Sequence, residues 1–101
     1  MAKGYWIAHV DVKDPDGYRR YTEANAAAFA KFGARFLVRG GGSAMAAGAL
    51  KPRHIVIEFK DYATALACLE SEEYRRAAVL RDQSSAVDLV VVEGYDAPQQ
   101  R

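Results

Sequence analysis

The sequence predicts an α+β fold in which helices cover one face of a four-stranded antiparallel sheet. Three observations lead to this prediction. Extended and helical segments follow one another in the order βαββαβ, with no internal repeat or linker. One alternation parity of the strands is entirely apolar, so one sheet face needs a cover. The 101 residues, 50% of them hydrophobic, suffice for one domain, which we place at residues 1–96, followed by a disordered tail at 97–101.

The N-terminal third contains a strand and a long helix. Residues Gly4–Val12 are rich in aromatic and β-branched side chains of alternating character, which is typical of a half-buried strand. Asp14 is placed to cap a helix with its side chain, and Pro15 suits the first helical position. We expect the helix over residues 15–32, with Gly33 in the left-handed conformation behind it. Its apolar positions recur at three- and four-residue steps, at Tyr18, Tyr21, Ala28, Phe29 and Phe32.

Two strands flank a glycine-containing loop in the middle of the chain. The first, Ala34–Arg39, ends at the three glycines 40–42. From Ser43 to Pro52 the residues are mostly small, and Gly48 is expected to turn the chain between two weak extended arms. Residues Arg53–Phe59 are the clearest strand, because the centre of this segment is β-branched throughout.

The remaining chain contains a broken helix and a last strand. Asp61 is expected to cap a helix that ends near Glu70, and Ser71 to start a second piece that ends near Gln83. Residues Ala86–Glu93 predict a final strand, since four consecutive aliphatic side chains lie at its centre. The order of elements is therefore that of the ferredoxin-like fold.

The two faces of the predicted sheet differ in chemistry. The face expected under the helices is apolar and consists of Trp6, Ala8, Val10, Phe36, Val38, Ile55, Ile57, Phe59, Val90 and Val92. The other face mixes apolar and ionisable side chains, namely Tyr5, Ile7, His9, Asp11, Arg35, Leu37, Arg39, His54, Val56, Glu58, Leu89, Val91 and Glu93. Because this face is too apolar for open water, we expect a homodimer in which the mixed faces of two copies meet.

Composition limits the class of protein. Fourteen Lys and Arg against thirteen Asp and Glu leave a net charge of +1, which disfavours nucleic acid as a partner. The single cysteine, Cys68, has no second cysteine to pair with, which favours a reducing cytoplasm. No Cys/His cluster has the spacing of a metal site, and no apolar run near the N-terminus is long enough for a signal peptide or a membrane span.

Several motifs resemble those of a known family. They are Gly4-Tyr5-Trp6-Ile7, Asp14-Pro15 with Tyr18 and Tyr21, the stretch FGARFLVRGG at 32–41, Val56-Ile57-Glu58-Phe59, Ser71 with Glu73-Tyr74, and Val92-Glu93-Gly94-Tyr95. Together they cover nearly the whole chain, which resembles the domain of unknown function 1330 family. The resemblance implies a dimeric α+β barrel, similar in fold to antibiotic-biosynthesis monooxygenases, muconolactone isomerases and haem-degrading monooxygenases, and it implies no particular activity. The Ala-rich stretch Ser43–Leu50 departs from the larger residues that relatives carry there.

The ionisable residues of the mixed face form a first candidate site. His9 and His54 share their parity with the carboxylates Asp11, Glu58 and Glu93. A histidine beside a carboxylate can transfer protons near neutral pH, which makes these residues candidates for catalysis and ligand binding. The alternative is that they form ion pairs at a subunit interface.

Arg39 is the third candidate catalytic residue. It stands beside the glycines 40–42, where its guanidinium and free backbone N–H groups could hold an anionic or carbonyl-bearing molecule together with His9 or His54. The glycines lack the spacing of a phosphate-binding loop, so they indicate chain reversal rather than a nucleotide site. Arg39 could equally pair with a carboxylate on a neighbouring strand.

Aromatic residues define a second candidate site, between sheet and helix. A ligand-binding cleft here would be lined by Trp6, Tyr18, Tyr21, Phe29 and Phe36. An ordinary hydrophobic core uses the same residue types, so both interpretations stay open. Asn25, one turn beyond Tyr21, could form a hydrogen bond with Tyr21 or with a ligand, although such a residue more often lies at the helix surface.

Two hypotheses about function remain. The first is an enzyme of the oxygenase, isomerase or lyase type that acts on a small organic molecule without a cofactor. The second is a non-catalytic, dimeric binding or stress-related module. Haem is disfavoured, because neither histidine lies on a helix that faces an apolar cleft.

Overall fold

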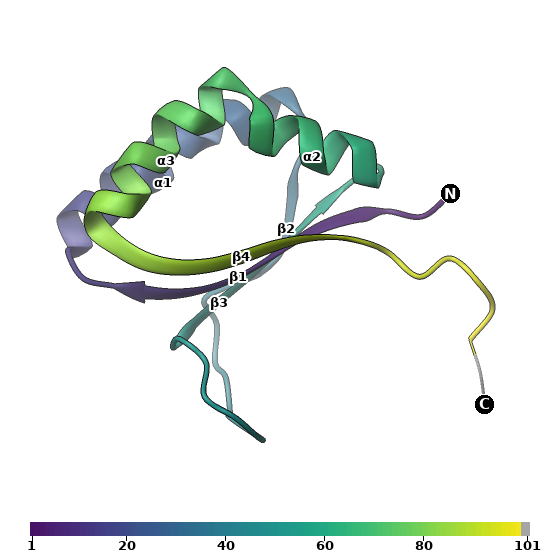
Figure 1. Cartoon of the computed structure of the whole chain (residues 1–101), viewed down its shortest axis with the longest axis horizontal. Helices are drawn as coiled ribbons and strands as arrows, with labels where there is room; N and C mark the ends of the chain where they lie inside the picture. Colours follow the sequence, from purple (N-terminus) through teal and green to yellow (C-terminus); the bar gives the residue numbers. More distant parts are fainter. Residues whose placement is uncertain (100–101) are drawn as a thin grey trace.

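The molecule has two layers, with the helices packed on one face of a four-stranded antiparallel sheet (Figure 1). The computed structural model describes residues 1–99. The strands are β1 (Gly4–Val12), β2 (Arg35–Arg39), β3 (Arg53–Phe59) and β4 (Ser85–Glu93). The helices are α1 (Pro15–Lys31), α2 (Tyr62–Glu70) and α3 (Glu72–Ser84). The predicted α+β class and the order βαββαβ, with the second helical region in two pieces, are confirmed.

The strand order is β2-β3-β1-β4, and all neighbouring strands are antiparallel. Residues directly opposite each other on paired strands share a face. Trp6 lies opposite Ile57 and Val91, and all three belong to the face under the helices. His9 lies opposite His54 on the uncovered face.

We call the uncovered side of the sheet the open face. The register assigns to it Tyr5, Ile7, His9, Asp11, Arg35, Val38, His54, Val56, Glu58, Ala86, Asp88, Val90 and Val92.

Capping residues start the two later helices as the sequence predicts. The Asp61 carboxylate accepts a hydrogen bond from the backbone N–H of Thr64 at 2.7 Å. The Ser71 hydroxyl accepts one from the backbone N–H of Tyr74 at 3.2 Å. Because Ser71 has an extended backbone, the helical chain is interrupted there and continues as α3.

Helix α1 ends as expected but starts differently. Gly33 follows it with a φ of 67°, in the left-handed region. Asp14 occupies the N-cap position, yet its side chain accepts no cap hydrogen bond, so this part of the prediction is wrong. The first bond of the helix runs from the N–H of Tyr18 to the backbone carbonyl of Asp14 at 2.9 Å.

The core between the layers centres on Trp6. Its indole Nε1 donates to the carbonyl of Ala65 at 2.9 Å, and its ring packs edge-on against Phe29 and Tyr74. Cys68 is buried in this core, as predicted, and burial raises the pKa of its thiol to about 12. The thiol is therefore protonated and serves as a small apolar group.

The predicted faces of β4 are wrong. Leu89 and Val91 pack against the core, while Val90 lies on the open face opposite Ile7 and is 50% exposed. Val92 shares the open face with Val90. Since the run at the centre of β4 is apolar on both faces, alternation alone does not fix which residues point inward, and the pairing with β1 decides it.

The predicted faces of Val38 and Arg39 are also wrong, because β2 contains a β-bulge. Phe36 and Val38 lie opposite consecutive residues of β3, so Leu37 is an extra residue in the strand. Val38 therefore lies on the open face rather than under the helices. Arg39, opposite Ile55, lies on the helix side rather than on the open face.

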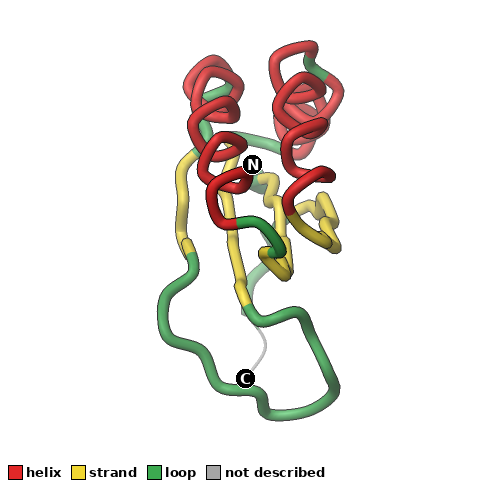
Figure 2. Tube along the Cα trace, turned by 90° about the vertical axis from the view of Figure 1, so that its left-hand side faces the viewer, coloured by secondary structure: helices red, strands yellow, loops and turns green. Residues whose placement is uncertain are grey.

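Residues 40–52 form a loop that projects from the sheet on the side away from the helices (Figures 1 and 2). It contains neither of the two expected extended arms. The side chains of the loop are mostly small and offer little apolar surface to stabilise a pair of strands. At the end of the loop, Lys51 forms an ion pair with Asp88 of β4. The predicted disordered tail at 97–101 lies partly outside the described residues and stays a prediction, as do the domain limits.

Candidate functional site

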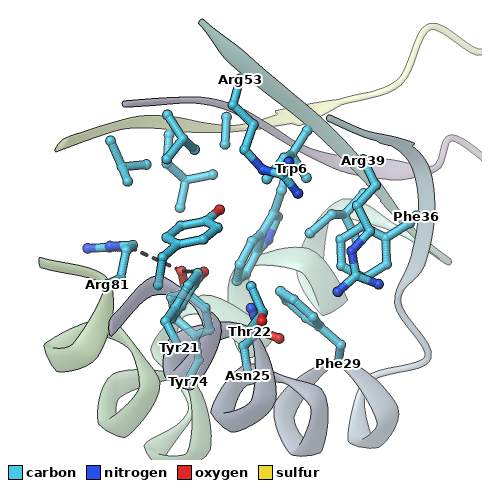
Figure 3. A pocket seen from close by; sticks show the side chains of 17 residues that line it. Trp6, Tyr21, Thr22, Asn25, Phe29, Phe36, Arg39, Arg53, Tyr74 and Arg81 are labelled. Atoms are coloured by element: carbon cyan, nitrogen blue, oxygen red, sulfur yellow. Dashed lines mark hydrogen bonds between the residues drawn. The ribbon is translucent and has the colours of Figure 1, made fainter. Parts of the chain in front are cut away.

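A cavity lies between the helix-facing side of the sheet and the helices α1 and α3 (Figure 3). Residues of all four strands form one wall, and aromatic residues of α1 and α3 form the other. The space open to the centre of a water-sized sphere measures about 30 Å³, and all the empty space between the lining side chains, including open solvent, about 500 Å³. The polar lining comprises Thr22, Asn25, Arg39, Arg53, Arg81 and the tyrosines 18, 21 and 74.

Two tyrosines and an arginine form a hydrogen-bonded chain at one side of the cavity. The hydroxyls of Tyr21 and Tyr74 lie 2.7 Å apart, and Arg81 Nη1 donates to the Tyr74 hydroxyl at 3.1 Å. Burial, followed by the neighbouring Tyr74, raises the pKa of Tyr21 well above its ordinary range. Tyr21 therefore stays neutral and can donate a hydrogen bond, but cannot serve as a base.

Two further arginines reach the cavity from the sheet. Arg53 lies with its Cζ 5.8 Å from the centre of the Tyr18 ring, and its Nε is buried without a hydrogen-bond partner. Arg39 stacks on Phe36, with its Cζ 4.1 Å from the ring centre. Within residues 1–99, neither guanidinium forms an ion pair.

The structure brings some predicted site residues together and separates others. Trp6, Tyr18 and Tyr21 line the cavity with Arg39, so the aromatic cleft between sheet and helix exists. The expectation that Arg39 shares a face with the histidines is wrong, because the bulge in β2 turns its side chain toward the helices. His9 and His54 lie together on the open face, with their Nδ1 atoms 2.8 Å apart.

The three predicted carboxylates lie away from the cavity. Asp11 pairs with Lys13 at 2.7 Å near the end of β1. Glu58 is on the open face opposite Tyr5. The prediction that Glu93 shares this face is wrong, because Glu93 lies opposite Gly4, in the register of the helix-facing side, and is exposed at the end of β4. Among the described residues, no aspartate or glutamate lines the cavity.

The sequence analysis missed Arg53 and favoured a surface position for Asn25, although the positions of both residues in the sequence indicate the interior. Arg53 shares its parity with Ile55 and Ile57 and is thus on the apolar side of β3. Asn25 occupies the four-residue step after Tyr21 on the inner stripe of α1 and is buried, contrary to the expected surface position. In both cases the polar residue type obscured a position that periodicity assigns to the interior.

No three side chains of the His, Cys, Asp or Glu types come together in residues 1–99 as a metal-binding group. No helix in that range has the length and apolar character needed to cross a bilayer.

Comparison with known protein families tests the resemblance noted in the sequence. Residues 3–95 match the family described as Domain of unknown function (DUF1330). The chain belongs to the DUF1330 family. None of the curated proteins compared matches it.

Solved structures share the fold of this DUF1330 member. RPA0582, a protein of unknown function from Rhodopseudomonas palustris, has a TM-score of 0.72 at 14% identity, covering 95% of this chain and 85% of that one. SnoaB, a cofactor-independent oxygenase from Streptomyces nogalater, has a TM-score of 0.63 at 14% identity, covering 99% and 97%. A dimeric ferredoxin-like protein of unknown function from Thermobifida fusca has a TM-score of 0.52 at 17% identity, covering 91% and 89%. At these identities the similarity establishes the ferredoxin-like fold alone.

Proposed function

We propose that the cavity binds a small, planar organic molecule, on which the protein acts as an enzyme without a cofactor. The observation that carries the proposal is the lining of the cavity, which combines aromatic walls with arginine, asparagine and tyrosine side chains. The fold shared with SnoaB, a cofactor-independent oxygenase, supports the class of chemistry.

The charge of the cavity suits a reaction that passes through an organic anion. Arg39 and Arg53 are fixed hydrogen-bond donors that would stabilise negative charge on an enolate or phenolate oxygen. Oxygenases, isomerases and lyases that work on acidic C–H or O–H groups share such an anion. Because no histidine or carboxylate lines the cavity among residues 1–99, we expect a substrate that ionises readily near neutral pH.

A ligand screen tests this proposal. Planar phenols and 1,3-dicarbonyl compounds are added to the protein, and a compound that binds the folded state raises its Tm. Thr22→Phe, which fills the cavity from α1, should abolish the rise, whereas Glu23→Phe on the exposed side of the same helix should leave it unchanged. A screen without a stabilising compound, or equal stabilisation of both variants, would argue against the cavity as the site.

Turnover separates the enzyme from the non-catalytic alternative. Each stabilising compound is incubated with the protein in air, while oxygen consumption and the absorbance of the compound are followed. Conversion that Thr22→Phe abolishes supports the enzyme. Binding without conversion of any compound favours a binding module.

We also propose that the open face joins two copies of the chain in a two-fold dimer. An apolar row crosses all four strands on this face and consists of Val38, Val56, Ile7 and Val90. The loop 40–52 projects on the same side and carries Met45 and Leu50, both 51% exposed. A second copy would cover both features at once, and the related protein from Thermobifida fusca is described as dimeric. The His9–His54 pair would then belong to the interface.

A further inference from the structure

Two guanidinium groups at the cavity have no counter-charge in the protein. Arg39 and Arg53 both line the cavity, and neither forms an ion pair or a side-chain hydrogen bond within the described residues. Arg53 is half-buried and Arg39 is exposed at the rim, so both charges are available to an anion that enters the cavity.

Arg53 is held in a defined position at the mouth of the cavity. Its guanidinium occupies the space where a Cβ of Gly40 would lie and stands against the ring of Tyr18. Its Nε is buried yet unpartnered, which is unusual for a group that donates strongly. In Figure 3 the side chain descends from the sheet toward the interior, facing Trp6 and the helix residues Thr22 and Asn25.

Arg39 lies next to Arg53 on the same side of the sheet. It pairs in register with Ile55, which is two residues from Arg53 along β3 and shares its face. Such diagonal neighbours on adjacent strands are within reach of long side chains. Stacking on Phe36 orients the Arg39 guanidinium, so that both groups border one volume (Figure 3).

Arg81, the third arginine of the cavity, differs from the other two. It donates through Nε to the Asp82 carboxylate at 3.0 Å and through Nη1 to the Tyr74 hydroxyl. Its charge is therefore balanced within the protein, which leaves Arg39 and Arg53 as the uncompensated pair.

We infer that Arg39 and Arg53 bind the carboxylate of a planar organic acid whose ring lies among the aromatic residues of the cavity. A guanidinium offers parallel N–H donors that match the two oxygens of a carboxylate, and no guanidinium N–H of Arg53 has a hydrogen-bond partner within the described residues. The aromatic walls favour an organic acid over an inorganic anion. The inference rests on the proposed cavity site and adds the chemical class of its ligand.

Benzoate and benzamide, which have nearly the same shape, test the role of the charge. ¹⁵N-labelled protein is titrated with each compound, and the backbone amide and arginine Nε–Hε signals are followed. We expect benzoate to bind about tenfold or more tightly than benzamide and to shift the Arg53 Nε–Hε signal, since a bond to a charged group is the stronger.

Three variants locate the effect. Arg53→Gln and Arg39→Gln should each weaken benzoate binding by about tenfold or more while changing benzamide binding little. Arg75→Gln removes the same charge from the exposed side of α3 and should leave both affinities unchanged. If a variant does not fold, the comparison of benzoate with benzamide on the unmodified protein still tests the inference.

The outcomes separate this inference from the proposed function. Equal binding of benzoate and benzamide within the cavity would overturn the carboxylate site and leave the small-molecule cavity standing. Binding of neither probe, or shifts confined to the open face, would also overturn the carboxylate site, and the ligand screen with Thr22→Phe would then decide the proposed function by itself. A preference for benzoate that survives both glutamine variants would also overturn the assignment to these arginines.

Discussion

Gly40 lies against the Arg53 guanidinium beside the cavity, so a substitution of Gly40 should displace this side chain. Gly33 serves as the control glycine. Gly40 has a φ of 68°, and a Cβ there would overlap the Arg53 guanidinium. Gly33 has a φ of 67° with open space around it. Gly40→Ala and Gly33→Ala should each lower the free energy of unfolding by about 1–2 kcal/mol through left-handed strain. Only Gly40→Ala should weaken benzoate binding, because only there must the guanidinium move.

Urea unfolding measures the two losses, and the benzoate titration measures the binding. Unchanged benzoate affinity in Gly40→Ala would mean that the position of Arg53 does not matter for the ligand. A loss of affinity in Gly33→Ala would point to a general loosening of the fold.

The two hydroxyls of the tyrosine pair should contribute unequally to stability. In Tyr21→Phe the Tyr74 hydroxyl still accepts from Arg81, so the loss is that of one hydrogen bond, about 1 kcal/mol. Tyr74→Phe leaves the buried Tyr21 hydroxyl and Arg81 Nη1 without this partner, and the unsatisfied group adds a further loss of about 1–3 kcal/mol.

Chemical denaturation of the two single variants and of the double variant tests this asymmetry. The double variant should lose less than the sum of the single losses, since it leaves no stranded tyrosine hydroxyl. Equal losses from the two single changes would contradict the hydrogen-bonded chain.

Among the elements, the start of α2 should give the fold a measurable sensitivity to acid. Hydrogen bonds with Thr64 hold the pKa of Asp61 below its ordinary value of 3.8. Because the pKa is lower in the folded than in the unfolded state, the carboxylate stabilises the fold above the ordinary value. This contribution is lost as the pH falls through the lower folded-state value.

Asp61→Asn is the matched variant, since asparagine also caps helices but does not titrate. The stability advantage of the unmodified protein over this variant should be constant near neutral pH and shrink between about pH 5 and pH 2. Thermal unfolding across this range measures it, and the other carboxylates cancel in the comparison. An advantage that does not change with pH would contradict the role of the cap.

The elements were predictable wherever one local signal decided them. The strand Gly4–Val12 and the breaks at Asp61 and Ser71 follow from alternation and capping, which act over a few residues. The faces of β4 were not predictable, because its apolar run is compatible with either phase until β1 sets the register. The bulge at Leu37 was not predictable either, since it depends on how β2 meets β3.

In the candidate site, too, local sequence signals predicted some features, while others depended on how the strands pair. The aromatic lining was expected from the helix stripe and the first strand, whereas Arg39 was assigned to the wrong face as a result of one extra residue in β2. Arg53 was overlooked, and the surface position was favoured for Asn25, because polar residues on an apolar stripe were not counted as interior. A polar residue at an interior position is a signal of function, since burial requires a partner from the protein, from water or from a ligand.

Across the whole molecule, the two proposals concern opposite faces of the sheet. The helix side encloses the cavity, and the open face presents an apolar row that no part of residues 1–99 covers. A dimer through the open face would leave the cavities of both copies accessible, because each lies on the opposite side of its own sheet. Assembly and ligand binding are therefore expected to respond to different substitutions.

Val56→Asp tests the proposed dimer directly. Val56 lies on the central part of the open face, between Val38 and Ile7, so the new carboxylate would be buried without a partner in the dimer. The half-buried position should tolerate the change in a single chain, so we expect a folded monomer near 11.1 kDa for the variant and twice this mass for the unmodified protein. Multi-angle light scattering measures the mass, and circular dichroism the fold.

Two further substitutions by aspartate serve as controls, one on an exposed helix surface and one in the core. Val79→Asp, on the exposed side of α3 where the valine is 56% exposed, should leave the dimer and its stability unchanged. Leu89→Asp places a charge on the core side of β4 and should unfold the chain, since an unpaired buried charge costs about 3–5 kcal/mol or more against a total stability of about 5–15 kcal/mol. A dimeric Val56→Asp of normal stability would show that the open face is not the interface. Dissociation by Val79→Asp would place the interface on the helices instead.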